Sequence, residues 1–143
     1  MILVPVIALV AWTLTVMLIM FAARAPAMKK AGIDIKTVSG GKPGGLDGVI
    51  EDKAQWPAHN YMHLVEQPTL FYAIAITMAV MHAGGGINLT LAWGYVGLRI
   101  AHSLVQISFN RVIVRFALFF LSSLVLMALT VQAFRAAMHL HLI

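Results

Sequence analysis

Five ionisable side chains interrupt the long apolar stretches of this chain, and their types could bind an anion or a metal ion. His59, His63 and Glu66 are four and three residues apart, so an α-helix places them on one face. Arg99 and His102 are three residues apart and also share a face. Ionisable groups within apolar helices are costly, and they usually face protein or trapped water at a working site. The spacing predicts a polar pocket between two helices.

An ion pair between Glu66 and Arg99 is the simplest expected link between these helices, because neither charge could be left alone in a low dielectric. Pro68 lacks an amide N–H, which predicts a kink and a free backbone carbonyl about one turn earlier. The same residues allow a purely structural interpretation. The ion pair would then only fix helix register, with the histidines hydrogen-bonded at the membrane interface.

A metal site is a further alternative for these residues. His59, His63 and His102 offer three imidazoles and Glu66 a carboxylate, a ligand set that suits zinc or non-haem iron. Arg99 opposes this interpretation, because its permanent positive charge lies one turn from His102. The second carboxylate of a di-iron helical bundle is also missing. We therefore expect no metal ligands here.

Arg111 and Arg115 are four residues apart, at the start of the last apolar stretch. Arg111 is the kind of residue that anchors a helix to lipid headgroups. Arg115 could instead point into the pocket and bind an anion. A guanidinium there would lower the pKa of a bound thiol, and the thiolate is the reactive nucleophile. Arg115 is therefore the candidate catalytic residue.

Composition indicates an integral membrane protein. The chain has 143 residues, of which 61% are hydrophobic and only 10% charged, so a large soluble catalytic domain is excluded. It contains no cysteine, so any thiol chemistry must use the thiol of a substrate. The formal net charge is +5, but the basic residues lie mainly beside apolar stretches. Membrane lipids are therefore the expected partner, and nucleic acid is not.

Four membrane-spanning helices are expected within a single domain, residues 1–143, which gives an all-α four-helix bundle. Their expected ranges are 1–23, 57–82, 88–110 and 115–138, with an exposed, glycine-rich loop at 24–56. Gly84 to Gly86 should separate the second and third helices, and Asn88 should cap the third. The positive-inside rule places the loop 24–56 and the turn at Arg111 in the cytoplasm and both termini outside.

The pattern His63-x-x-Glu66-x-Pro68-x-x-Phe71-Tyr72, followed by Arg99-x-x-His102 and by Arg115 sixteen residues after Arg99, resembles the MAPEG family. These are the membrane-associated proteins in eicosanoid and glutathione metabolism, and they include leukotriene C synthase, prostaglandin E synthase, microsomal glutathione transferase and many bacterial relatives. Residue motifs carry the resemblance over 59–134, and topology alone carries it over the first helix. A bacterial-type member in the inner membrane is expected.

The resemblance implies a homotrimer that holds glutathione between neighbouring subunits and receives a lipophilic substrate from the bilayer. Glu66 and Arg99 match the family's glutathione contacts, with His59, His63 and His102 adding polar contacts. Arg115 matches the arginine that stabilises the thiolate. The implied activity is that of a glutathione transferase or peroxidase, with the thiol used for conjugation, peroxide reduction or isomerisation.

Four positions depart from the family pattern. His63 replaces a common asparagine, His59 a common arginine and Gln106 a tyrosine of the eicosanoid enzymes, and Phe119 lacks a hydroxyl. These changes are compatible with weaker anion binding or with a different thiol. Two alternatives to the transferase therefore stay open. They are a non-catalytic lipid- or partner-binding scaffold of the same fold and a metal-dependent membrane enzyme.

Overall fold

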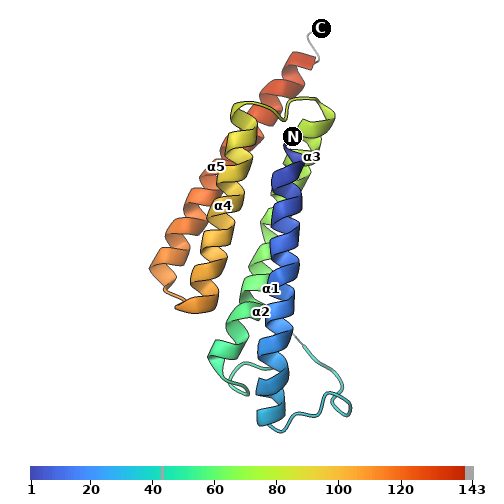
Figure 1. Ribbon diagram of the computed structural model, residues 1–143, viewed down its shortest axis with the longest axis vertical. Helices are drawn as coiled ribbons and strands as arrows, with labels where there is room; N and C mark the ends of the chain where they lie inside the picture. The colour runs from blue at the N-terminus through green and yellow to red at the C-terminus, as the bar shows by residue number, and fades with distance from the viewer. Residues whose placement is uncertain (43, 141–143) are drawn as a thin grey trace.

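The computed structural model describes residues 1–42 and 44–140, and every regular element in these residues is an α-helix. The helices are α1 (Leu3–Lys30), α2 (Asp52–Glu66), α3 (Pro68–Val80), α4 (Ile87–Ser108) and α5 (Val112–Leu140). They run lengthwise beside one another (Figure 1). α2 and α3 are separated only by Gln67 and continue as one kinked rod. The expected all-helical bundle of four rods is confirmed.

Two rods, α1 and α5, are long and apolar enough to cross a membrane. Ile2, directly before α1, and Leu9 and Val16 within it are buried, recur every seven residues and form one seam against the rest of the bundle. The other apolar side chains of this helix are mostly exposed or partly buried, and only 22% of its most apolar stretch is buried. A helix in the core of a soluble protein would be mostly buried, so this pattern is typical of a lipid-facing helix.

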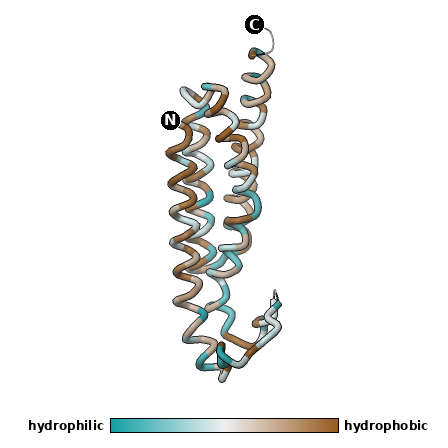
Figure 2. Tube along the Cα trace, turned by 90° about the vertical axis from the view of Figure 1, so that its right-hand side faces the viewer, coloured by the Kyte–Doolittle hydropathy of each residue, from teal (hydrophilic) through white to brown (hydrophobic). Residues whose placement is uncertain are grey.

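The other two rods carry most of the buried polar side chains. These are Gln55, Asn60, Arg99, His102, Ser103 and Gln106, which all lie in α2 or α4, whereas α5 contributes Ser122. Polar groups lower the hydropathy of α4, and the break at Gln67 divides the second rod into two short helices. Neither α4 nor the rod formed by α2 and α3 is therefore both as long and as apolar as the candidate membrane spans α1 and α5. Figure 2 shows hydrophobic residues along the rods and hydrophilic ones near the end where α1 and α2 are joined.

Several expected boundaries differ from the structure; the last helix, for example, begins at Val112 rather than at 115. The first helix continues to Lys30 rather than ending at residue 23, and α2 begins at Asp52 rather than at 57, so the loop is 31–51. Asp52 lies in the first turn of α2, where its negative charge interacts favourably with the helix dipole and stabilises the start of the helix. Asn88 does not cap α4, because its side chain donates to the carbonyl of Ala83 at 2.8 Å.

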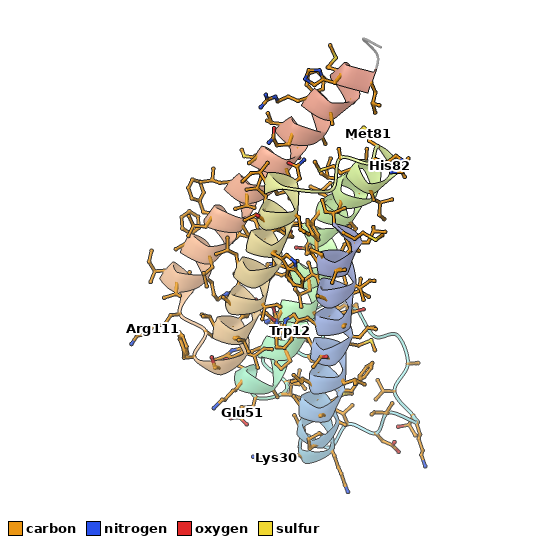
Figure 3. All side chains as sticks on the ribbon, turned by 45° about the horizontal axis from the view of Figure 1, so that its top comes forward. Trp12, Lys30, Glu51, Met81, His82 and Arg111 are labelled. Atoms are coloured by element: carbon orange, nitrogen blue, oxygen red, sulfur yellow. The ribbon has the colours of Figure 1, made fainter. Side chains whose placement is uncertain are left out.

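The connecting segments divide between the two ends of the bundle. The loop 31–51 and the α4–α5 turn lie toward one end, and the N-terminus and the α3–α4 turn lie toward the other (Figure 1). Figure 3 shows Lys30 and Glu51 at the first end, Met81 and His82 at the second, and Arg111 at the tip of the α4–α5 hairpin. The two basic segments therefore share an end, as the positive-inside argument requires.

Gly84 is the point at which the α3–α4 turn meets the start of α1. A Cβ atom at this position would lie 2.5 Å from Cγ2 and 2.9 Å from Cβ of Ile2, which is buried. We expect Gly84→Ala to lower the free energy of unfolding by about 1–3 kcal/mol, the usual cost of overpacking. Unfolding in mixed micelles, followed by circular dichroism, measures the change.

Gly85→Ala is the matched control for Gly84→Ala. No heavy atom lies within 4 Å of the Cβ that would be added at Gly85, and its backbone does not have the positive φ of Gly86. This variant should stay within about 0.5 kcal/mol of the parent protein. Equal effects of the two substitutions would show that the contact with Ile2 does not stabilise the fold.

Candidate functional site

The kink between α2 and α3 brings a backbone carbonyl to a buried arginine. α2 ends at Glu66, and Pro68 opens α3 without an amide N–H of its own. Nη2 of Arg99, in α4, donates a hydrogen bond to the carbonyl oxygen of His63 at 2.6 Å. The sequence predicted a kink at Pro68 and a free carbonyl about one turn earlier. The structure shows a helix break at Gln67, and the carbonyl that Arg99 uses belongs to His63, five residues before Pro68.

Gln67, at the centre of the kink, is the second partner of Arg99. Its Oε1 accepts hydrogen bonds from Nη1 of Arg99 at 3.4 Å and from the hydroxyl of Tyr95 at 3.3 Å. Its Nε2 donates to Oγ of Ser123, in α5, at 2.8 Å. One side chain therefore joins three rods in a polar layer. Arg99 itself is 0% exposed, with the ring of Phe119 5.8 Å from its Cζ.

The expected ion pair between Glu66 and Arg99 was wrong. The Glu66 side chain is 61% exposed, and its Oε2 lies 3.4 Å from Nδ1 of His63. Burying a carboxylate beside the guanidinium would cost the desolvation of two charges. The neutral amide of Gln67 and a backbone carbonyl supply acceptors at lower cost, so Glu66 stays at the surface.

His59 lies apart from the other predicted site residues. Its Nε2 is 3.8 Å from Oδ1 of Asp47, in the loop, and that same oxygen accepts a hydrogen bond from Gln55 at 2.8 Å. A loop residue therefore contacts His59, in α2. Among the residues that the structure describes, no three His, Asp or Glu side chains are placed to hold a metal ion. The three-imidazole ligand set of the metal alternative is therefore not assembled within this chain.

Three cationic or titratable side chains from three helices meet at one pocket. His63 of α2 and His102 of α4 lie edge to face, with ring centroids 6.0 Å apart. These two histidines and Arg115 of α5 line a pocket of about 250 Å³ with Val112, Phe116 and Phe119. The pocket therefore has a polar wall from three helices and an apolar wall from α5.

Asn110 fixes the position of Arg115. Oδ1 of Asn110 accepts a hydrogen bond from Nη1 of Arg115 at 2.7 Å. Asn110 has φ of 50°, a left-handed conformation that asparagine tolerates better than most residues and that ends α4 directly before the turn. Nε of Arg115 is buried and has no hydrogen-bond partner among the described residues. The guanidinium thus keeps a free donor.

The structure brings His63, His102 and Arg115 together at one pocket. Arg99 donates to the backbone carbonyl of His63, and Glu66 lies beside the His63 side chain. His59 contacts Asp47 of the loop instead. Gln67, Tyr95 and Asn110 were not predicted as site residues from the sequence. Gln67 was as good a candidate as Glu66, since it lies four residues after His63 and so shares its helix face. Gln106, which stands at a family tyrosine position, is buried, and its Oε1 has no partner in the described part of the chain.

Apolar outer helices around a buried polar layer, with a pocket lined by Arg115 and two histidines beside it, are typical of a helical membrane protein. The sequence model of the MAPEG family matches residues 2–135, so the chain belongs to the MAPEG family. No curated protein and no solved structure matches the chain.

Proposed function

We propose that this protein binds a small anionic thiol, with glutathione as the expected one, and activates it for attack on a lipophilic electrophile. The activity would be that of a glutathione transferase or peroxidase. One observation carries the proposal. His63, His102 and Arg115 line the same pocket as Val112, Phe116 and Phe119. The guanidinium of Arg115 suits a thiolate, and an apolar wall suits a lipophilic co-substrate.

Arg115 is the proposed activating residue. Its guanidinium carries a permanent charge and a buried Nε without a partner among the described residues. A thiol bound beside it would lose its proton more readily, because the positive charge stabilises the thiolate. In a conjugation, the thiolate sulfur would form a bond to the electrophilic carbon while the bond from that carbon to its leaving group breaks, and the leaving group would depart with the electron pair as the thiol proton passes to solvent. In the peroxidase alternative, two thiols would be oxidised to a disulfide while the O–O bond of the peroxide is cleaved to give an alcohol and water.

Glu66 and the two histidines would position the peptide part of glutathione. The exposed carboxylate of Glu66 lies on the rim, 3.4 Å from His63, where it could bind a ligand ammonium group. A homotrimer would add residues from a neighbouring subunit on the exposed side of this pocket. The lipophilic co-substrate would enter past Val112 and Phe116, which are exposed on α5. We place this end of the bundle, with its basic segments, on the cytoplasmic side of a bacterial inner membrane.

Calorimetric titration of the detergent-solubilised protein with glutathione tests the proposal. We expect saturable binding to the parent protein, and Glu66→Gln should raise Kd roughly two- to fivefold, as expected for loss of a partly exposed charge pair. Glu51→Gln makes the same chemical change at the start of α2, outside the pocket, and should leave Kd unchanged. Absence of binding heat with the parent protein, or equal effects of both substitutions, would contradict the proposed role.

A further inference from the structure

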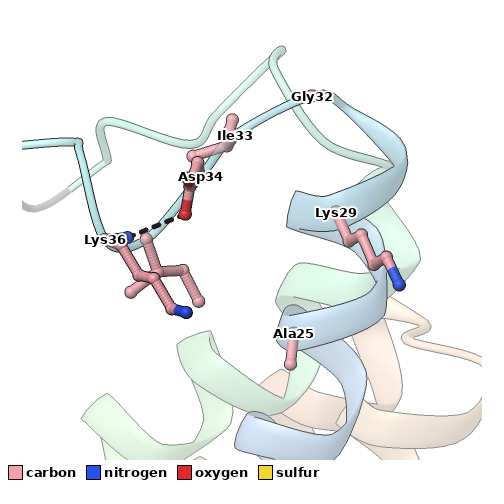
Figure 4. A pocket seen from close by; sticks show the side chains of 7 residues that line it. Ala25, Lys29, Gly32, Ile33, Asp34 and Lys36 are labelled. Atoms are coloured by element: carbon pink, nitrogen blue, oxygen red, sulfur yellow. Dashed lines mark hydrogen bonds between the residues drawn. The ribbon is translucent and has the colours of Figure 1, made fainter.

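A second pocket lies at the junction of α1 and the loop 31–51, far from the kink in sequence. It measures about 680 Å³ and is lined by Ala25, Lys29, Gly32, Ile33, Asp34, Ile35 and Lys36. Figure 4 shows Lys29 on the last turn of α1 and Lys36 across the opening on the loop. The pocket thus combines two ammonium groups with apolar side chains.

Charge and position both limit what could occupy this pocket. Residues 24–42 contain five basic side chains and one acidic side chain, so the surroundings are strongly positive. Neither Lys29 nor Lys36 forms an ion pair within the part of the chain that the structure describes. Asp34 uses Oδ1 to accept a hydrogen bond from the backbone amide of Lys36 at 2.9 Å, which stabilises the turn. An anionic group is therefore favoured over a cationic one.

The apolar side chains of the loop indicate which anion this is. Ile35, which lines the pocket beside Lys36, is 65% exposed, and Val38, on the same loop but outside the lining, is 57% exposed. A free phosphate would gain nothing from them. The pocket also lies at the end of a membrane-spanning helix, which is where lipid headgroups meet water. Lysine ammonium groups beside exposed aliphatic side chains suit the boundary between headgroup and acyl chain.

We propose that this pocket binds the headgroup of one anionic phospholipid. Lys29 and Lys36 contact its phosphate, and Ile33 and Ile35 contact the glycerol and upper acyl carbons. The loop 31–51 is then held against the membrane surface. This site is independent of the thiol pocket, so failure of either proposal leaves the other standing.

Native mass spectrometry of protein taken from mixed phosphatidylglycerol and phosphatidylcholine bilayers tests this site. We expect one retained phosphatidylglycerol per chain and no retained phosphatidylcholine. The double variant Lys29→Gln/Lys36→Gln should weaken retention by roughly a factor of five for each lysine removed. Lys30→Gln/Lys53→Gln removes the same charge at the same end of the bundle but outside the pocket, and should have little effect.

Two further comparisons distinguish binding of a whole lipid from binding of free phosphate and from general attraction to surface charge. Ile35→Ser should reduce lipid retention, whereas Val49→Ser removes a similarly exposed aliphatic side chain that does not line this pocket. Inorganic phosphate should not displace the lipid. Equal losses in the two lysine double variants would indicate a general surface charge and overturn the proposal. Displacement by inorganic phosphate, or retention of both lipids alike, would also overturn it.

Discussion

Replacing Arg115 by alanine should lower thiol-dependent turnover by roughly 100-fold or more, the usual cost of removing one group that stabilises developing negative charge. The side chain lies at the pocket with His63 and His102 and has a buried Nε without a partner in the described residues. Its removal should leave the helices intact, because among the described residues the Arg115 side chain donates a hydrogen bond only to Asn110. Steady-state rates with glutathione and a lipophilic electrophile measure the effect, and circular dichroism verifies folding.

Asn110→Gly is the companion variant for Arg115→Ala. Glycine adopts the positive φ of this position without strain but cannot hold the guanidinium. Turnover should fall by less than in Arg115→Ala, and Asn110→Asp, which keeps an acceptor oxygen, should restore much of it. A protein that acts as a scaffold would show no thiol-dependent turnover in any of these forms. An Arg115→Ala variant with unchanged turnover would reject the activating role.

Gln67→Leu should be the most destabilising single substitution that we predict. It removes the acceptor for Arg99 and Tyr95 and the donor to Ser123. A single hydrogen bond between membrane helices averages about 0.6 kcal/mol, but a fully buried guanidinium that loses a partner costs more. We expect a loss of about 2–4 kcal/mol in the free energy of unfolding, measured by titration with sodium dodecyl sulfate.

Gln132→Leu makes the same change in α5 at a position whose side chain accepts a hydrogen bond from the exposed Arg135. It should stay within about 0.5 kcal/mol of the parent protein. Gln67→Glu should retain more stability than Gln67→Leu, because a carboxylate still accepts from Arg99. If Gln67→Leu were no less stable than Gln132→Leu, the polar layer would not hold the rods together.

The helical bundle and the kink could be predicted because both depend on local sequence. Long apolar runs give the rods, and Pro68 removes one amide whatever surrounds it. The partner of Arg99 depends instead on how α4 is rotated against the second rod. Glu66 and Gln67 are adjacent, so their side chains leave the helix about 100° apart. No pattern in the sequence states which of them faces α4.

His59 shows a second limit of prediction from sequence. The helical spacing that groups it with His63 is correct, but Asp47 comes from an irregular loop and gives His59 a separate partner. Asn110 is similar, because its role follows from a positive φ at the end of α4. Contacts made by loops and turns have no periodicity, so a search for helix faces cannot find them.

Arg99 donates its hydrogen bonds to the neutral amide of Gln67 and to the backbone carbonyl of His63 rather than to a carboxylate. Its positive charge is therefore not neutralised inside the bundle. A full positive charge thus remains on Arg99, next to the backbone of His63, and the charge of Arg115 in the pocket adds to it. The low-dielectric walls of the pocket focus the electric field of both guanidinium groups toward its opening, because little water is present to screen it. An anion approaching from solution would be accelerated toward the opening, and added salt would slow its capture more than its escape.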